Sequence, residues 1–194
     1  MHAKTHFTVA DLAALPDPDG PHEIWRGELL LVSPSTVAHG SVCSRLLAAL
    51  ATHVYGRGLG ELVTEATAFW LERDPDTVFC PDIAFVDGRR LAAGDMEAAW
   101  AELAPDLAVE VLSPSDRPGR MRTKVAEYLR LGVRGVWVVD PKARRIVAHA
   151  GTTGALGDRG KTVRVFAESE DLDGGGTLPG FSHPVAAVFA GLSR

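Results

Sequence analysis

Hydrophobic and polar positions along the chain follow two periods, which predict a mixture of helices and strands. Apolar residues recur at helical spacing over 37–55 and 119–131. Thr8 and Asp11 resemble a capping box and indicate a short helix over 8–15. A hairpin that turns at Arg26-Gly27 is expected over 22–33. The remaining ranges are strands at 61–71, 78–86, 106–112, 134–139, 144–149 and 161–167, a helical segment over 94–103, and a short C-terminal helix.

The order of these elements predicts the fold class. The middle of the chain runs helix, three strands, helix and strand. The run GVWVVD at 134–139 is nearly all apolar, as expected of a central strand that is covered on both faces. We therefore expect an α/β fold with a mixed central sheet flanked by helices, an N-terminal hairpin and a C-terminal strand pair. With 194 residues and no internal repeat, residues 1–194 are expected to form a single domain.

Two carboxylates interrupt apolar strands, and buried carboxylates need a partner. Asp82 lies within VFCPDIAFV, and Glu110 lies within DLAVEVLSPS. An unpaired buried charge is costly, so each side chain requires a cation, a proton or a metal ion. If the two strands are neighbours, both carboxylates can converge on one hard cation such as Mg²⁺. The alternative is that each pairs with an arginine or caps a backbone group.

Three further residues carry candidate chemistry. In the helix 119–131, Lys124 falls inside the apolar arc of Tyr128 and Val125, so it either snorkels to solvent or meets a carboxylate. In the helix 37–55, His39 shares the inward face and is either a site residue or a satisfied core histidine. Glu23, in the hairpin, is either a distal metal or water ligand or a solvated strand residue.

The cysteines and the apolar runs bear on location. Cys43 and Cys80 form no CxxC pattern, so their spacing suggests neither a zinc site nor a disulfide framework. They are expected to be buried thiols in a reducing compartment. The N-terminal residues lack the apolar stretch of a secretory signal, and no run approaches the ~20 residues of a membrane span. We expect a soluble, cytoplasmic protein without membrane contact.

Taken together, these residues resemble the PD-(D/E)XK nuclease superfamily, and within it the Uma-type restriction endonuclease family. The resemblance covers about residues 7–190 and includes HEIWRGELLLVSPS, PDIAFV, PDLAVEVLSPSDR, AEYLRLGV, RGVWVVDP and LPGF. It implies a restriction-endonuclease-like αβββαβ core and a divalent-metal-dependent phosphodiesterase. Asp82 and Glu110 match the metal-binding acids, with Mg²⁺ or Mn²⁺ as cofactor. Asp82 is preferred to Asp106, which lies on the same strand as Glu110.

The sequence departs from the superfamily pattern at one position. Two residues after Glu110, where the superfamily usually has lysine, the chain has Leu112. Lys124, one element later and pointing the same way, is the expected replacement. Glu23 and His39 match recurrent family positions and are expected to act as secondary catalytic residues.

The function that follows is an endonuclease acting on nucleic acid, with DNA as the expected substrate. One alternative is a noncatalytic nuclease-fold module for binding or interaction, which Leu112 favours. Another is a phosphodiesterase acting on small nucleotides. Cleavage of both strands of a duplex would be compatible with a homodimer.

The distribution of charge along the chain indicates where a nucleic-acid partner would bind. The formal net charge of −5 excludes a nonspecific nucleic-acid coat. The stretch Arg117–Arg145, however, carries nine basic and two acidic side chains, a net charge of +7 that leaves −12 for the rest. This basic stretch begins seven residues after Glu110 and includes Lys124. A phosphate backbone is therefore expected to dock there, with a solvated basic face as the alternative.

Overall fold

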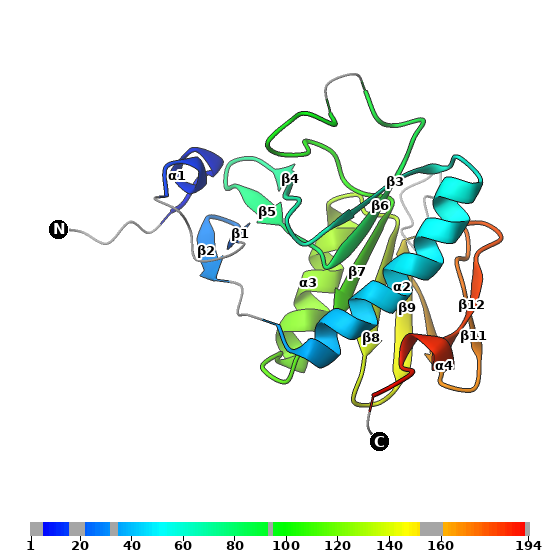
Figure 1. Ribbon diagram of the computed structural model, residues 1–194. Coiled ribbons are helices and arrows are strands. Elements are labelled where there is room, and N and C mark those ends of the chain that lie inside the picture. Colours follow the sequence, from blue (N-terminus) through cyan, green and yellow to red (C-terminus); the bar gives the residue numbers. More distant parts are fainter. Residues whose placement is uncertain (1–5, 16–21, 32–34, 93–94, 152–160, 193–194) are drawn as a thin grey trace.

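The structure is a computed structural model that describes residues 6–15, 22–31, 35–92, 95–151 and 161–192. A six-stranded sheet forms its centre, and the two long helices, α2 (Val37–Gly56) and α3 (Pro118–Arg130), lie on its opposite sides (Figure 1). This is the mixed sheet between helices that the element order predicts. None of the described helices is both long and apolar enough to cross a membrane.

The central sheet has the strand order β10-β9-β8-β7-β6-β3. Only β7 and β8 pair in parallel, and α3 connects them; the other neighbours are antiparallel. The C-terminal strand pair therefore extends the same sheet. The strands are β3 (Gly60–Thr64), β6 (Ile83–Asp87), β7 (Leu107–Val111), β8 (Gly135–Asp140), β9 (Arg145–Gly151) and β10 (Lys161–Ala167).

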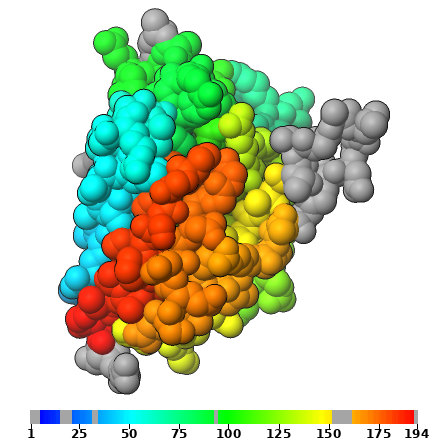
Figure 2. Space-filling model, turned by 90° about the vertical axis from the view of Figure 1, so that its right-hand side faces the viewer, coloured from blue at the N-terminus to red at the C-terminus, as the bar shows by residue number. Residues whose placement is uncertain are grey.

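Alternation along β7 decides which helix meets which residues. Val109 belongs to the apolar cluster that includes Leu46 and Leu50 of α2. Ala108 belongs to the cluster that includes Val125 and Tyr128 of α3. Since successive strand residues point to opposite faces, Glu110 lies on the α3 side of the sheet, with Ala108. The C-terminal segment packs beside α2, as Figure 2 shows in orange to red against cyan.

A second sheet of four strands has the order β2-β1-β5-β4. The predicted hairpin is confirmed, and both turn residues have positive φ, 50° at Arg26 and 81° at Gly27. The predicted short helix α1 begins with the capping box of Thr8 and Asp11. The elements are α1 (Val9–Ala13), β1 (His22–Trp25), β2 (Glu28–Leu31), β4 (Phe69–Glu72) and β5 (Thr77–Phe79).

Two strand predictions are wrong because the chain passes from one sheet to the other. The range 78–86 divides at Pro81 into β5 of the small sheet and β6 of the central sheet. Proline donates no backbone hydrogen bond and favours such a break. The range 61–71 divides likewise into β3 and β4. Apolar patterning alone does not reveal that a strand changes its partners.

The helix predicted over 94–103 is also wrong. Residues 95–103 form turns and one isolated bridge between Ala101 and Phe69. Trp100 and Leu103 nevertheless pack against apolar clusters beside the small sheet, so their pattern reflects burial without a helix. The chain ends with β11 (Asp171–Asp173), β12 (Ser182–Pro184) and the short helix α4 (Val185–Val188).

Candidate active site

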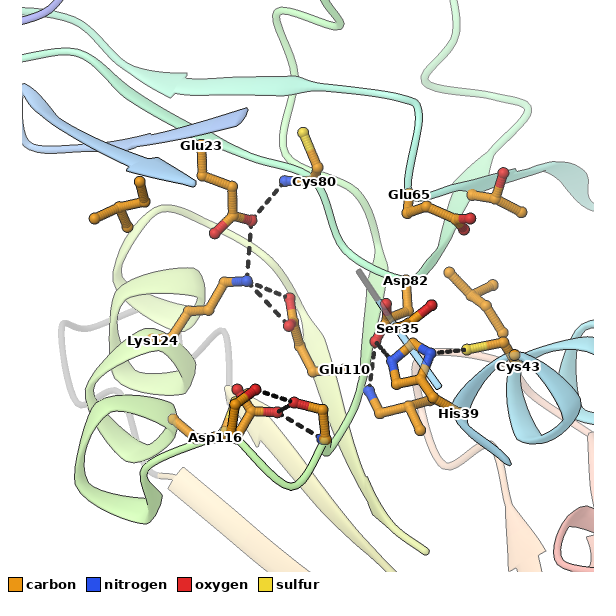
Figure 3. Close-up of a pocket in the computed structure, with 18 of the residues that line it drawn as sticks. Glu23, Ser35, His39, Cys43, Glu65, Cys80, Asp82, Glu110, Asp116 and Lys124 are labelled. Atoms are coloured by element: carbon orange, nitrogen blue, oxygen red, sulfur yellow. Dashed lines mark hydrogen bonds and ion pairs between the residues drawn. The ribbon is translucent and has the colours of Figure 1, made fainter. Parts of the chain in front are cut away.

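One cavity of about 1180 Å³ contains all five residues that the sequence singles out. Glu23 comes from β1, His39 from α2, Asp82 from the chain before β6, Glu110 from β7 and Lys124 from α3. Figure 3 shows them converging from five separate segments. The cavity thus lies where the two sheets and the first turns of both long helices meet.

Lys124 lies between two carboxylates on the inner side of α3. Its Nζ lies 3.0 Å from Oε1 of Glu23 and 2.9 Å from Oε1 of Glu110. All three side chains are nearly enclosed, with 13% of Lys124 exposed and less than a tenth of each carboxylate. The inward orientation predicted from the helical period is confirmed, and Lys124 does not snorkel to solvent. The two carboxylates hold the pKa of Lys124 above its ordinary value despite burial.

Glu110 is held by a second donor from the same helix. The Tyr128 hydroxyl, one turn after Lys124, donates to Oε1 of Glu110 at 2.7 Å. Burial raises the pKa of Glu110, and Lys124 opposes that rise. Burial, followed by the charges of Glu110 and Glu23, raises the pKa of the Tyr128 hydroxyl, which therefore keeps its proton as a donor. Glu110 is therefore a fixed, buried carboxylate whose charge depends on a neighbouring cation.

Glu23 is buried, so it is no solvated strand residue. Its Oε1 accepts two hydrogen bonds, one from the Lys124 ammonium at 3.0 Å and one from the backbone N–H of Cys80 at 2.9 Å. The small sheet therefore contributes a carboxylate to a cluster whose other members belong to the central sheet and its helix. Glu23 fixes Lys124 from the side opposite Glu110 (Figure 3).

Asp82 lies between β5 of the small sheet and β6 of the central sheet, where the chain passes from one sheet to the other. Residues Ile83 of β6 and Val109 of β7 are paired, which confirms that the two acidic segments are neighbours. Oδ2 of Asp82 accepts the backbone N–H of Val111 at 2.6 Å, so the alternative that it caps a backbone group is realised. The same oxygen lies 3.3 Å from Nε2 of His39. Asp82 and Glu110 line one cavity but have different hydrogen-bond partners.

His39 is a bridging residue and no ordinary core histidine. Its Nδ1 lies 3.6 Å from Sγ of Cys43, one helical turn later, while Nε2 faces Asp82. The neighbouring carboxylate raises the pKa of His39 to about 10. At neutral pH the ring therefore carries a positive charge beside Asp82. The N-cap of α2 places the ring there, because Thr36 accepts the backbone N–H of His39.

Sequence reasoning missed Tyr128 and Cys43. Both follow a candidate residue by four positions on a helix, and that spacing places them one turn away on the same face. Leu112 packs in the apolar cluster of α3, so the position that usually holds lysine is filled by an aliphatic side chain. Asp106 is buried and lies 2.8 Å from Arg90 and 2.9 Å from Arg134, outside the lining of the cavity.

Comparison with known proteins assigns this arrangement to a family. The model of the Uma2 family, described as "Putative restriction endonuclease", matches residues 9–187. The chain belongs to the Uma2 family. No curated protein matches it. The crystal structure titled as a "putative nuclease belonging to DUF820" from Anabaena variabilis superimposes with a TM-score of 0.75 at 16% identity, covering 94% of this chain and 97% of that one. Because the identity is low, the match shows a shared fold and nothing more. It confirms the restriction-endonuclease-like architecture that the sequence predicts for this Uma2 chain.

Proposed function

We propose that this Uma2 protein is a divalent-metal-dependent endonuclease that hydrolyses phosphodiester bonds of nucleic acid, with DNA as substrate. The family description and the fold of the structural neighbour both support a nuclease. The observation that carries the proposal is the buried ammonium of Lys124 between Glu23 and Glu110, in a cavity that Asp82 also lines.

The donor set fits a hard divalent cation. Asp82 and Glu110 supply carboxylate oxygens, the ligands that Mg²⁺ and Mn²⁺ prefer. The charged side chains that line the cavity are five carboxylates and four cations: Glu23, Glu65, Asp82, Glu110 and Asp116 against His39, Arg117, Arg120 and Lys124. The carboxylates thus exceed the cations by one, and a divalent ion would offset that excess. A bound ion would lower the pKa of water and offset negative charge on the phosphate.

The chain's own residues then divide the remaining work. Because its pKa is raised, Lys124 stays an ammonium, which has no lone pair and cannot act as a general base. It can donate hydrogen bonds to an attacking water or to a phosphate oxygen as charge develops. Glu23 and Glu110 fix its position, and Tyr128 fixes Glu110 in turn. His39 orients Asp82 through the contact at Nε2.

The first turn of α3 is the proposed docking surface for the phosphate backbone. Within the stretch 117–145, several cations are already paired: Arg130 with Glu72 and Glu127, Arg134 with Asp106, Arg144 with Glu168 and Arg145 with Asp140. Arg117, Arg120 and Arg122 are exposed and form no salt bridge with a described residue.

The helix end itself adds to this surface. Arg117 and Arg120 line the cavity, and no side chain caps the N-terminus of α3. The first N–H groups of a helix and its dipole favour an anion such as phosphate. Lys142 is also exposed, but it does not line the cavity, so we place the docking surface at Arg117 and Arg120.

The test is cleavage of supercoiled plasmid by the purified chain with Mg²⁺ or Mn²⁺, run beside single-stranded RNA and mononucleotide phosphodiesters. Asp82→Asn and Glu110→Gln are expected to abolish metal-dependent cleavage. Glu65→Gln is the matched control, since Glu65 is an exposed carboxylate of the same cavity outside the cluster. Linear product from single binding events would indicate a dimer, and nicked product a monomer.

The other functions give distinct results in the same assay. A noncatalytic module would bind DNA without cutting it in either metal, and a nucleotide phosphodiesterase would hydrolyse only the small substrates. Cleavage that persists in both Asp82→Asn and Glu110→Gln would refute the proposed site.

A further inference from the structure

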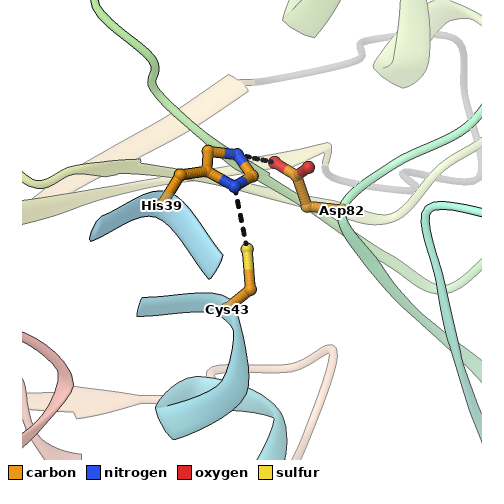
Figure 4. A group of neighbouring side chains, drawn as sticks. All are labelled: His39, Cys43 and Asp82. Carbon is orange, nitrogen blue, oxygen red and sulfur yellow. Dashed lines mark hydrogen bonds and ion pairs between the residues drawn. The ribbon is translucent and has the colours of Figure 1, made fainter. Parts of the chain in front are cut away.

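Beside the Lys124 cluster, the same cavity wall holds a second group of side chains with a different chemistry. His39 and Cys43 lie one turn apart on α2, and Asp82 faces them from the start of β6 (Figure 4). One ligand atom from each residue, a ring nitrogen, a sulfur and a carboxylate oxygen, lies within 4.8 Å of the other two. These three residues are the His39–Cys43–Asp82 group.

The geometry is close to that of a metal site. Ligand atoms of a tetrahedral zinc ion, bound at about 2.0 to 2.3 Å, are separated by about 3.5 Å. Sγ of Cys43 lies 3.6 Å from Nδ1 of His39, and Oδ2 of Asp82 lies 3.3 Å from Nε2, so these two contacts use opposite nitrogens of the ring. One ion takes only one of the two nitrogens. Because one ligand atom from each residue lies within 4.8 Å of the other two, a rotation of the ring and side-chain shifts of about 1 Å would bring three ligand atoms to the separation found around zinc. Two ligands at i and i+4 on a helix form a preorganised chelate.

The donor atoms select the ion. A nitrogen, a sulfur and one oxygen suit borderline ions such as Zn²⁺, whereas Mg²⁺ prefers oxygen alone. We propose that His39, Cys43 and Asp82 form a binding site for Zn²⁺, which competes at Asp82 with the hard ion of the nuclease reaction.

Zinc binding involves no change of oxidation state, and protons are the only groups released. The Cys43 thiol loses its proton to solvent, and the His39 ring gives up the proton on the coordinating nitrogen, while Asp82 binds through a carboxylate oxygen. Asp82 thereby exchanges its contact with His39 for the ion. The inference that Asp82 is then no longer available to the Mg²⁺ or Mn²⁺ site with Glu110 rests on the proposed function. Zinc binding itself does not rest on it.

Sequence spacing alone gives no sign of this site. Cys43 and Cys80 lie far apart without a CxxC pattern, so cysteine counting points away from zinc. The fold supplies the other ligands instead, since β6 brings Asp82 opposite the first turns of α2.

Binding is tested with the metal alone, by calorimetry with Zn²⁺ and by absorption with Co²⁺, which gives a thiolate-to-cobalt charge-transfer band. The full chain is expected to bind one equivalent and show the band. Cys43→Ser and His39→Gln are expected to weaken Zn²⁺ binding at least about tenfold, and Cys43→Ser to lose the band. Cys80→Ser is the matched control, because this thiol lines the same cavity but faces the carbonyl of His22.

The result that overturns the site is Zn²⁺ affinity and a cobalt band that are unchanged in Cys43→Ser, with circular dichroism confirming that each variant is folded. Zinc binding that depends on Glu110 and not on Cys43 would also overturn it, because it would place the ion among the hard ligands.

Competition is tested separately by plasmid cleavage in Mg²⁺ with added Zn²⁺. The wild type is expected to be inhibited, and Cys43→Ser, measured against its own cleavage rate in Mg²⁺ alone, to need at least about tenfold more Zn²⁺ for the same fractional inhibition. Equal inhibition of both would overturn the competition. A chain that shows no cleavage in Mg²⁺ contradicts the proposed function, while the binding experiment still decides the zinc site.

Discussion

Replacing Lys124 with methionine tests whether the buried cation holds the active-site carboxylates in their charged state. Methionine keeps an apolar stem of similar length but lacks the Nζ, which lies 5.3 Å from the ring centroid of Phe79 and 5.7 Å from that of Tyr128. It removes the ammonium from between Glu23 and Glu110, whose side chains are 8% and 9% exposed. Breaking a buried ion pair by removing one partner typically costs about 3–5 kcal/mol. We expect Lys124→Met to lose about 3 kcal/mol of unfolding free energy at pH 8.

The loss should depend on pH with a definite sign. Burial already raises the pKa of Glu110, and removing Lys124 removes the charge that opposes the rise. An acid whose folded pKa lies above its unfolded value makes the folded state bind more protons, so stability falls as pH rises. At pH 5 Glu110 in the variant is expected to be protonated and neutral. The deficit of Lys124→Met should then shrink by at least about 1 kcal/mol relative to pH 8.

The assay is urea unfolding at pH 5 and pH 8, followed by tryptophan fluorescence. A double-mutant cycle with Glu110→Gln should give a loss at least about 1 kcal/mol smaller than the sum of the single losses, because the double variant leaves one carboxylate without the ammonium, Glu23, where Lys124→Met alone leaves two. Arg145→Met is the control, since Arg145 is half exposed and 3.6 Å from Asp140, and it should cost less than about 1 kcal/mol. Equal losses for Lys124→Met at both pH values, together with additive behaviour in the cycle, would refute the reasoning.

Three other predictions concern side chains of α3. Tyr128→Phe removes the buried hydroxyl that donates to Glu110 at 2.7 Å and should cost about 1.5–3 kcal/mol in urea unfolding; no loss would mean that the hydroxyl does not hold Glu110. Hydrogen bonds from Arg130 and Arg26 lower the pKa of Glu127 to about 2, so the stability that ionised Glu127 contributes is present above about pH 4.5 and is lost as pH falls toward 2. Glu127→Gln should therefore reduce the loss of stability between these pH values by about 1–2 kcal/mol in thermal melts recorded at several pH values. A loss equal to that of the wild type would contradict this role of Glu127. Arg120→Glu should weaken binding of a short DNA duplex, measured by fluorescence anisotropy, and reduce its salt dependence, whereas Arg164→Glu on β10 should leave both unchanged; equal effects would argue against docking at α3.

The period of apolar residues is sufficient to predict side-chain orientation where a helix or strand buries one face along its whole length. The helical period of 119–131 placed Lys124 among Tyr128 and Val125, and in the structure the ammonium does point inward. The same applies to His39, to the hairpin turn at Arg26-Gly27 and to the apolar strand β8. In each case burial on one face imposes a period that can be read without knowledge of the partner.

Patterning failed where the chain changes partners. The apolar stretch 78–86 is continuous in sequence, yet it serves two sheets, and the break at Pro81 is what turns Asp82 toward Val111 and His39. The partly buried Trp100, Ala101 and Leu103 satisfy an apolar pattern without helical backbone. Hydrophobicity records that a residue is covered, but it does not record which element covers it.

Residue patterns are enough to predict the sheet between two helices, the inward direction of Lys124 and the acidic character of the site. They do not predict the partners, which the folded chain brings together: Glu23 of the second sheet with Lys124, Tyr128 with Glu110, and Cys43 and Asp82 with His39. The physical reason is that periodicity is a property of one element, whereas a hydrogen bond or an ion pair needs two elements brought within about 3 Å of each other.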